Sequence, residues 1–439
     1  MSGAPLYAVE RWSELADMYA GDWALRLSQL VRQSAPARAW HVPATVWGLG
    51  ITSLLTDVSS EMVVSILPAY LMFMSGGGPV ALGIAAGLYE GGPVVATWLG
   101  GWMADRSGRR KLTAGSGYAL SALCRLGWLL VPGRALGPIA ALVVADRLGK
   151  AIRTTPRDAL ISLSVPPRQL ATAFGVHRAL DAIGAALGPV AAWMLLSTYP
   201  RRYDIVFFAS IVAALLGLVA LVLLVRDDRQ PPLDRMRWRQ MRESAADVFA
   251  DAALRRVLVI ATLLGVVTIR DAFVYLLLVQ GTDANAHWIP LLYSGTAVVF
   301  LTLAIPLGVM ADRLGRARVF LAGHVVLLAV YAVALGARSA WPWNALGCVA
   351  LLGVYYACTD GVLAGLAAGL LPADRRSLGL AWILTGVSLG RLCGAVVFGL
   401  LWARYGASAA VGIFAALLML LVASAGLWLR RGEGTAVTS

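Results

Sequence analysis

The chain has 439 residues, of which 59% are hydrophobic and 14% are charged, and its mean hydropathy is +0.74. Soluble domains are about 45–50% apolar and about 25% charged, so this composition excludes an ordinary soluble protein. The formal net charge of +13 would fit a nucleic-acid partner or a membrane protein with basic cytoplasmic loops.

Residues 1–41 precede the first long apolar run. Trp12, Ala16, Tyr19, Trp23 and Leu27 recur there at steps of three or four residues, with charged residues between them. This spacing predicts an amphipathic helix at the cytoplasmic membrane interface. A loosely ordered tail is the alternative.

Twelve apolar runs follow, and each is long enough to cross a bilayer as a helix. They lie at 42–74, 80–104, 112–131, 136–156, 171–196, 205–225, 257–280, 288–311, 318–337, 343–371, 378–402 and 407–429. The long polar connection at 226–256 divides them into a first bundle at 42–225 and a second at 257–431, before a tail at 432–439. We therefore predict an all-α integral membrane protein with two pseudo-symmetric six-helix bundles.

Lys and Arg gather in both tails and in the even-numbered connections between the runs. Such a bias places those segments in the cytoplasm. We expect a multi-pass protein of a bacterial inner membrane with both termini inside. The bias also accounts for the basic charge, so a nucleic-acid partner is not expected.

Cysteine usage and short motifs indicate no enzyme. Cys124, Cys348, Cys358 and Cys393 all lie in apolar runs without a Cys-x-x-Cys pair, so no zinc site or disulfide framework is indicated. The sequence also lacks a nucleotide-binding P-loop, a Gly-x-Ser-x-Gly element and a His-Glu-x-x-His element. We expect no cofactor.

Two similar segments follow the second run of each half. They read GWMADRSGRRKL at 101–112 and GVMADRLGRARV at 308–319. This duplication predicts parallel repeats, which place a substrate site between the two halves near the middle of the membrane.

The repeated segment has the residues of a gate latch. Its glycines permit a tight turn and close helix contact, and its aspartate can bind an arginine or the positive end of a helix. A bond of this kind can exist in one packing of the halves and break in the other; a device that only fixes topology is the alternative. The candidate gating residues are Gly101, Asp105, Arg106, Gly108, Arg109, Arg110 and Lys111, with Gly308, Asp312, Arg313, Gly315 and Arg316 in the second copy.

The fourth run contains an unusual charged stretch, DRLGKAIRTTPRD, at 146–158. On a helix, one face carries Asp146, Lys150, Arg153 and Arg157, while Arg147 lies about 100° away. Pro156 is expected to end or kink the helix. Because a charge at the bilayer centre costs at least about 2.5–3.5 kcal/mol, the stripe must face a wet cavity or partner charges.

Other runs supply partners for this stripe, and the first half is richer in them. Buried carboxylates opposite arginines can exchange protons as a cavity opens and closes. Static salt bridges are the alternative, and for the histidine a structural role. With the stripe, the candidate residues for coupling and the substrate pathway are Asp57, Glu61, Glu90, Arg125, His177, Arg178, Asp181, Arg270, Asp271, Asp360 and Arg391.

These motifs resemble those of a known family. Residues 101–111 match Gly-x-x-x-Asp-Arg-x-Gly-Arg-Arg-Lys, which is similar to the signature between helices two and three of the major facilitator superfamily. Residues 146–149 loosely resemble its helix-four Arg-x-x-x-Gly element, and 184–192 resemble a Gly-Pro element of helix five more often linked with exporters. The resemblance covers about 42–431. It departs at Ala317, where a base is usual, which implies a weaker second gate.

The resemblance implies a twelve-helix transporter. The stretches at 54–62, 146–163 and 174–181 look similar to a bacterial branch of the family whose members are mostly uncharacterised or assigned by analogy to drug export. We expect a monomer that exports a small solute by alternating access, with protons as the coupling ion. Some similar proteins are linked to metal-ion or siderophore handling, so a transporter of an iron- or nickel-type ion or of a siderophore is the alternative. A transporter-like membrane receptor or scaffold is the second alternative.

Overall fold

The structure is a computed structural model that describes residues 42–74, 76–91, 110–131, 135–166, 169–225, 251–279, 283–336, 342–371 and 376–435. Side chains are described for these residues except 171, 283–285, 376–378 and 427–435. This part of the chain is helical and contains no strand, which confirms the predicted all-α class.

The first half begins with α2 (Ala44–Ala69), which continues as the π-helix η1 (Tyr70–Met74). A helix at 78–91 follows, then α4 (Arg110–Leu130), α5 (Leu136–Leu163), α6 (Leu170–Thr198) and α7 (Tyr203–Leu224). Helix α2 packs on α6 and α7, and α4 packs on α5.

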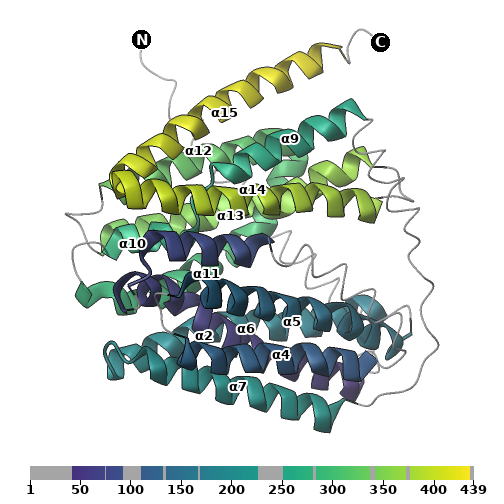
Figure 1. The fold of residues 1–439 in the computed structure, drawn as a ribbon. Helices are drawn as coiled ribbons and strands as arrows, with labels where there is room; N and C mark the ends of the chain where they lie inside the picture. The colour runs from purple at the N-terminus through teal and green to yellow at the C-terminus, as the bar shows by residue number, and fades with distance from the viewer. Residues whose placement is uncertain are drawn as a thin grey trace, which may run out of the picture. The chain divides into compact units, whose positions relative to one another are not determined.

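The second half contains α9 (Ala252–Val266), α10 (Asp271–Val279), the 3₁₀ helix η3 (Asp283–Trp288) and α11 (Ile289–Leu314). It ends with α12 (Arg316–Leu335), α13 (Trp343–Leu370), α14 (Arg376–Tyr405) and α15 (Ala407–Thr435). Helix α13 packs on α11 and α12, and α14 packs on α9 (Figure 1).

Nine helical segments among the described residues are long and apolar enough to cross a membrane. Helices α4 and α5 are not among these nine, and α5 is the helix that carries the charged stretch at 146–158. The helices lie close to the predicted runs, with two differences. Helix α5 does not end at Pro156 but continues to Leu163, because Leu160 and Ile161 are buried in the bundle and stabilise its last turns.

The second difference is a break in the predicted run at 257–280. Helix α9 ends at Val266, the backbone leaves the helical path at Val267–Arg270, and α10 begins at Asp271. The Tyr331 hydroxyl of α12 satisfies two backbone groups at this break. It donates to the Val267 carbonyl at 3.0 Å and accepts from the Ile269 N–H at 2.7 Å. Irregular backbone at membrane depth is tolerated where protein satisfies its polar groups in this way.

The described helices alternate in direction, which gives the molecule two ends. At one end, on the right of Figure 1, α2 begins, α7 ends and α9 begins; we call this the terminal end. The hairpin end is the opposite one, where short turns join α6 to α7 and α14 to α15.

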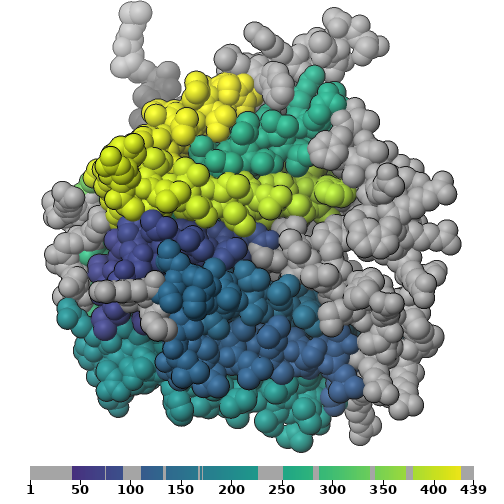
Figure 2. All heavy atoms as spheres, viewed as in Figure 1, coloured from purple at the N-terminus to yellow at the C-terminus, as the bar shows by residue number. Residues whose placement is uncertain are grey.

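The two halves meet closely along the helix at 78–91 and α14, which lie side by side in Figures 1 and 2. A Cβ atom at Gly83 would lie 2.7 Å from the Ala395 carbonyl oxygen, and one at Gly87 would lie 2.9 Å from that of Leu392. Only glycine permits so close an approach of two backbones.

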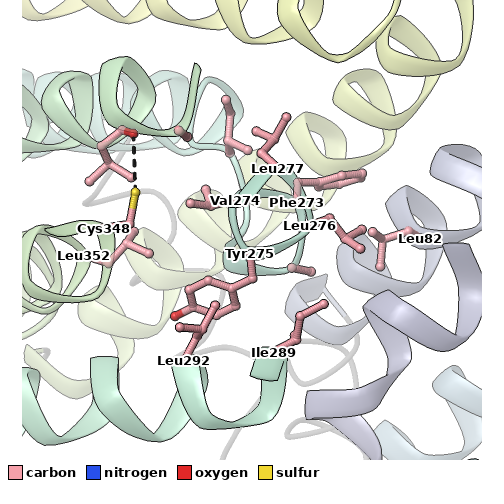
Figure 3. Close-up of a cluster of buried hydrophobic side chains, with 14 of the residues drawn as sticks. Leu82, Phe273, Val274, Tyr275, Leu276, Leu277, Ile289, Leu292, Cys348 and Leu352 are labelled. Atoms are coloured by element: carbon pink, nitrogen blue, oxygen red, sulfur yellow. Dashed lines mark hydrogen bonds between the residues drawn. The ribbon is translucent and has the colours of Figure 1, made fainter. Parts of the chain in front are cut away.

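Helix α10 forms a dry core toward the hairpin end, because all its residues after Asp271 are buried. Figure 3 shows Phe273, Val274 and Leu276 projecting from this short helix into the surrounding cluster. Leu82 of the first half belongs to the same buried cluster, so apolar packing joins the halves here.

Candidate functional site

The charged face of α5 points into the first half rather than toward lipid. Asp146, Arg147, Arg153 and Arg157 expose at most 7% of their surface, while Lys150 is half-buried. The helix packs against α4, and this contact is close because a Cβ at Gly117 would lie 2.6 Å from the Gly149 carbonyl oxygen. These four buried charges therefore lie against other charged side chains inside the bundle.

Asp146 lies between two arginines. Arg125 Nη2 is 2.9 Å from one carboxylate oxygen, and Arg147 Nη2 is 2.6 Å from the other. Arg125 also donates to Ser60 Oγ at 2.9 Å, and the Arg147 guanidinium covers the ring of Tyr89 at 4.4 Å. These partners compensate the buried charges, while Nε and Nη1 of Arg125 and Nε of Arg147 make no hydrogen bond within the described part of the chain.

Asp57 takes part in a second cluster toward the terminal end. Its carboxylate is 3.5 Å from Arg153 Nη2, and the Arg153 guanidinium covers the Tyr118 ring at 4.7 Å. Ser53 donates to the Asp181 carboxylate at 2.5 Å and accepts from Arg157 at 3.4 Å. Three helices, α2, α5 and α6, are joined by these bonds.

Glu90 connects the two halves. It stands near the end of the helix at 78–91, and its carboxylate oxygens are 2.7 Å from Arg270 and 3.6 Å from Arg391. Arg391 of α14 also lies 3.4 Å from the Asp360 carboxylate of α13. A carboxylate of the first half is thus held by two arginines of the second.

The break in the α9–α10 span positions one of these arginines. Arg270 is the last residue before α10, and its carbonyl accepts from the Phe273 and Val274 N–H groups, which starts the helix. Asp271 follows and accepts a short hydrogen bond from the Tyr356 hydroxyl. The break therefore turns Arg270 toward Glu90 and Asp271 toward α13.

A cavity of about 210 Å³ lies between the halves at this level. Its polar lining consists of Glu61, Tyr89, Glu90, Arg147, Arg270, Asp271 and Tyr293. Within the described part of the chain, the Glu61 carboxylate forms no ion pair, although it interacts electrostatically with Lys150. Glu61 is therefore a carboxylate of the cavity wall that the ion pairs of the described residues do not include.

The remaining predicted pathway residues lie apart from this cavity. His177 is 1% exposed, and its Nε2 atom has no partner among the described residues. Arg178, next to it on α6, is exposed on another side of the helix. Whether either residue acts in a pathway stays a prediction.

The first gate segment falls mostly outside the described residues, which exclude Gly101, Asp105, Arg106, Gly108 and Arg109. Arg110 is buried, and Lys111 donates to the Val222 and Val225 carbonyls at 3.0 and 2.5 Å, which caps the end of α7. This contact fixes the start of α4 against α7.

The second gate segment is described in full. Gly315 has φ of +100°, which favours glycine and permits the turn between α11 and α12. Asp312 pairs with Arg316 at 2.7 Å, and Arg316 donates to the Gly365 carbonyl of α13 at 2.7 Å. Arg313 is exposed, and a Cβ at Gly308 would meet open space, so no close helix contact exists there.

Sequence reasoning missed the tyrosines of the site. Tyr89 and Tyr293 line the cavity, Tyr331 bridges the helix break, and Tyr356 holds Asp271. The adjacent Tyr355 and Tyr356, five and four residues before Asp360, were the available signal, because tyrosine buried in an apolar run usually needs a polar partner.

Comparisons with known proteins agree with this architecture. The model of the Major Facilitator Superfamily matches residues 49–284 and 273–439. The MFS-type transporter MJ1317 of Methanocaldococcus jannaschii is 28% identical over 366 residues, which cover 81% of this chain and 88% of the relative. The multidrug resistance protein MdtG of Enterobacter lignolyticus is 24% identical over 411 residues, covering 91% and 94%.

Solved structures show the same fold. The nucleoside transporter NupG has a TM-score of 0.73 at 14% identity, over 87% of this chain and 98% of its own. The peptide transporter POT bound to sulfate has a TM-score of 0.70 at 15% identity, over 92% and 98%. Identities this low carry the fold alone.

The matched residues extend through both halves, and the described helices, the repeated segments and the solved structures all agree with one architecture. The chain belongs to the Major Facilitator Superfamily, a family of membrane transporters and not of enzymes.

Proposed function

We propose that the protein exports a small solute from the bacterial cytoplasm by alternating access and that the proton gradient drives the movement. The observation that carries this proposal is the attachment of Glu90 to both Arg270 and Arg391 across the two halves. Movement of the halves apart at this level breaks both contacts together, and a carboxylate left in the membrane then needs a proton or a new partner.

Glu61 supports proton coupling as a second carboxylate of the same cavity. It lies on α2, four residues after Asp57, so the two acids are neighbours on one helix face. Lys150 interacts electrostatically with both. A proton that reaches Glu61 therefore changes the charge felt by the α5 network, which links solute access to the packing of the first half.

The direction of opening follows from where the halves touch. The glycine contacts along 78–91, the α10 core and the 3.2 Å bond from Ser294 to the Ala186 carbonyl join the halves toward the hairpin end. With the terminal end in the cytoplasm, as the basic connections favour, we assign this structure to the state closed on the outside.

The alternatives gain less support. Among the described residues, no group of three His, Cys, Asp or Glu side chains is arranged to hold a metal ion. A receptor or scaffold would have no use for a carboxylate that two arginines of the other half hold in a cavity.

The first step of the test is to find a compound whose amount in cells depends on the protein. Metabolites and metals are compared by mass spectrometry between cells with and without the protein, and the compound that changes is supplied to proteoliposomes with an imposed pH gradient. We expect flux that stops when the gradient is dissipated and falls at least about tenfold in Glu90→Gln, which corresponds to about 1.4 kcal/mol.

Asp204→Asn is the matched control, because Asp204 is an exposed carboxylate paired with exposed Arg202 at 2.8 Å. Its flux should equal that of the natural protein. Flux that persists without a gradient, or that is normal in Glu90→Gln, would contradict proton coupling through Glu90.

A further inference from the structure

A second cavity, of about 290 Å³, is lined by residues of the second half alone. Its polar and aromatic lining includes Thr268, His324, Tyr355, Thr359, Asp360 and Arg391. Thr268 belongs to the helix break, whose next residues, Arg270 and Asp271, line the cavity between the halves. The break therefore lies between the two cavities. Arg391 lines the cavity of the second half and also contacts Glu90, which lines the cavity between the halves.

One wall of the second cavity is aromatic. The rings of Phe320 and His324 meet at 4.7 Å and 63°, and those of His324 and Tyr355 meet at 5.5 Å and 86°. These edge-to-face contacts lock the three rings against one another. His324 and Tyr355 expose only 3% and 2% of their surface, so the part of this wall that a further ring can meet is small.

Three further groups on the cavity wall act as hydrogen-bond acceptors, beside Ser388 and Arg391, which can donate. His324 Nδ1 lies 2.9 Å from the Phe320 carbonyl oxygen, which can only accept, so Nδ1 carries the proton and Nε2 is left as an acceptor. Thr268 and Thr359 each donate their hydroxyl proton to the carbonyl four residues earlier, at 2.8 Å. Their oxygens thus offer only lone pairs.

Asp360 adds a negative charge to these acceptors. Its side chain is 45% exposed, and its contact with Arg391 is long, at 3.4 Å. Because Arg391 also approaches Glu90, it is shared between two carboxylates. Asp360 can therefore pair with a cation that enters the cavity, while Arg391 stays in its ion pair with Glu90.

We infer that this cavity binds a compact aromatic amine, with its ring against His324 and Tyr355 and its ammonium group at Asp360. The volume is at the lower end of the usual range for small-molecule sites, about 300–1,000 Å³, which favours a single ring system. The inference rests on the proposed function, since it names the class of solute that the transporter takes up from the terminal end.

Binding to the purified protein in detergent tests the inference without any transport. Phenethylamine is titrated calorimetrically against the full chain, beside cyclohexylethylamine, which lacks the aromatic ring, and phenylacetate, which reverses the charge. We expect saturable binding of phenethylamine, binding about tenfold weaker for cyclohexylethylamine, and none for phenylacetate.

Variants locate the bound amine. Asp360→Asn should weaken phenethylamine binding at least about tenfold, and His324→Phe, which keeps a ring but removes the acceptor, should weaken it severalfold. Asp204→Asn should bind as the natural protein does. Thermal unfolding shows whether each variant keeps the fold. If a site variant does not fold, the binding of the three compounds to the natural protein still tests the inference.

Three results would each overturn the inference: no saturable binding of phenethylamine, equal binding of phenylacetate, or binding that is unchanged in Asp360→Asn. These results leave the proton test with Glu90→Gln unaffected. Conversely, flux that needs no proton gradient would refute the coupling mechanism while the calorimetric data on this cavity still stood.

Discussion

The two halves of the molecule share a helical plan but use their polar residues differently. In the first half, Asp146 and Asp57 bind arginines of α4 and α5, so the charges hold helices together. In the second half, a tyrosine hydroxyl supports a broken helix, and hydroxyl and aromatic groups line a cavity. The comparison teaches that duplicated sequence does not require duplicated roles: one half fixes geometry through charge, and the other offers space.

The largest effect is expected from removing the central charge of the first half. Asp146→Ala leaves Arg125 and Arg147 without the carboxylate that both bind, at 2.9 and 2.6 Å. Loss of one partner in a buried ion pair costs about 3–5 kcal/mol. The measurement heats the protein in detergent and records the fraction that stays monodisperse. The Asp146→Ala variant should unfold at a lower temperature than the natural protein, whereas Asp204→Ala should unfold at the same temperature.

The next effect tests the broken helix of the second half. Tyr331→Phe removes the hydroxyl that satisfies the Val267 carbonyl and the Ile269 N–H, and two unsatisfied buried groups cost about 1–3 kcal/mol each. The same unfolding measurement should detect this cost. Tyr118→Phe in the first half is the matched control, because the Tyr118 hydroxyl has no partner within the described part of the chain; an equal loss in both variants would contradict a special role for Tyr331.

A smaller effect is expected at the seam between the halves. In Gly87→Ala the new methyl group would lie 2.9 Å from the Leu392 carbonyl oxygen, and overpacking of this kind costs about 1–3 kcal/mol before relaxation. Separation of the halves relieves the clash, so a cysteine placed at Leu82 should react faster with a thiol reagent. Gly347→Ala, where a Cβ meets open space, should leave that rate unchanged.

The smallest effect is expected at the second gate segment. Asp312 and Arg316 form an exposed pair four residues apart on the chain, and such pairs contribute about 0.3–0.5 kcal/mol. Asp312→Asn should therefore change stability by no more than this amount. A large change would show that the pair acts together with the bond from Arg316 to Gly365.

Most of the fold could be predicted from the sequence because long apolar runs and basic connections leave few other arrangements. The break at Val267–Arg270 was not predicted, since the run contains no proline there. Its signal was the series Val266, Val267, Thr268 and Ile269, whose β-branched side chains all disfavour helix.

The candidate site was predictable only in part. The charged face of α5 follows from helical spacing, but no periodicity in the sequence shows that Glu90 meets Arg270 and Arg391, which depends on how the halves pack. Pro156 illustrates how packing limits a local rule: a helix end or a kink was expected there, and the helix continues to Leu163, with Leu160 and Ile161 buried in its last turns.

The short helix α10 has a consequence for insulation. Its nine residues span about 13 Å at 1.5 Å each, which is nearly half of a hydrocarbon layer of about 30 Å. Since all but the first are buried, this rod and its neighbours form an apolar block of that thickness toward the hairpin end. An ion that passed α10 would have to leave water for these apolar surroundings, which costs at least about 2.5–3.5 kcal/mol at the centre of a membrane.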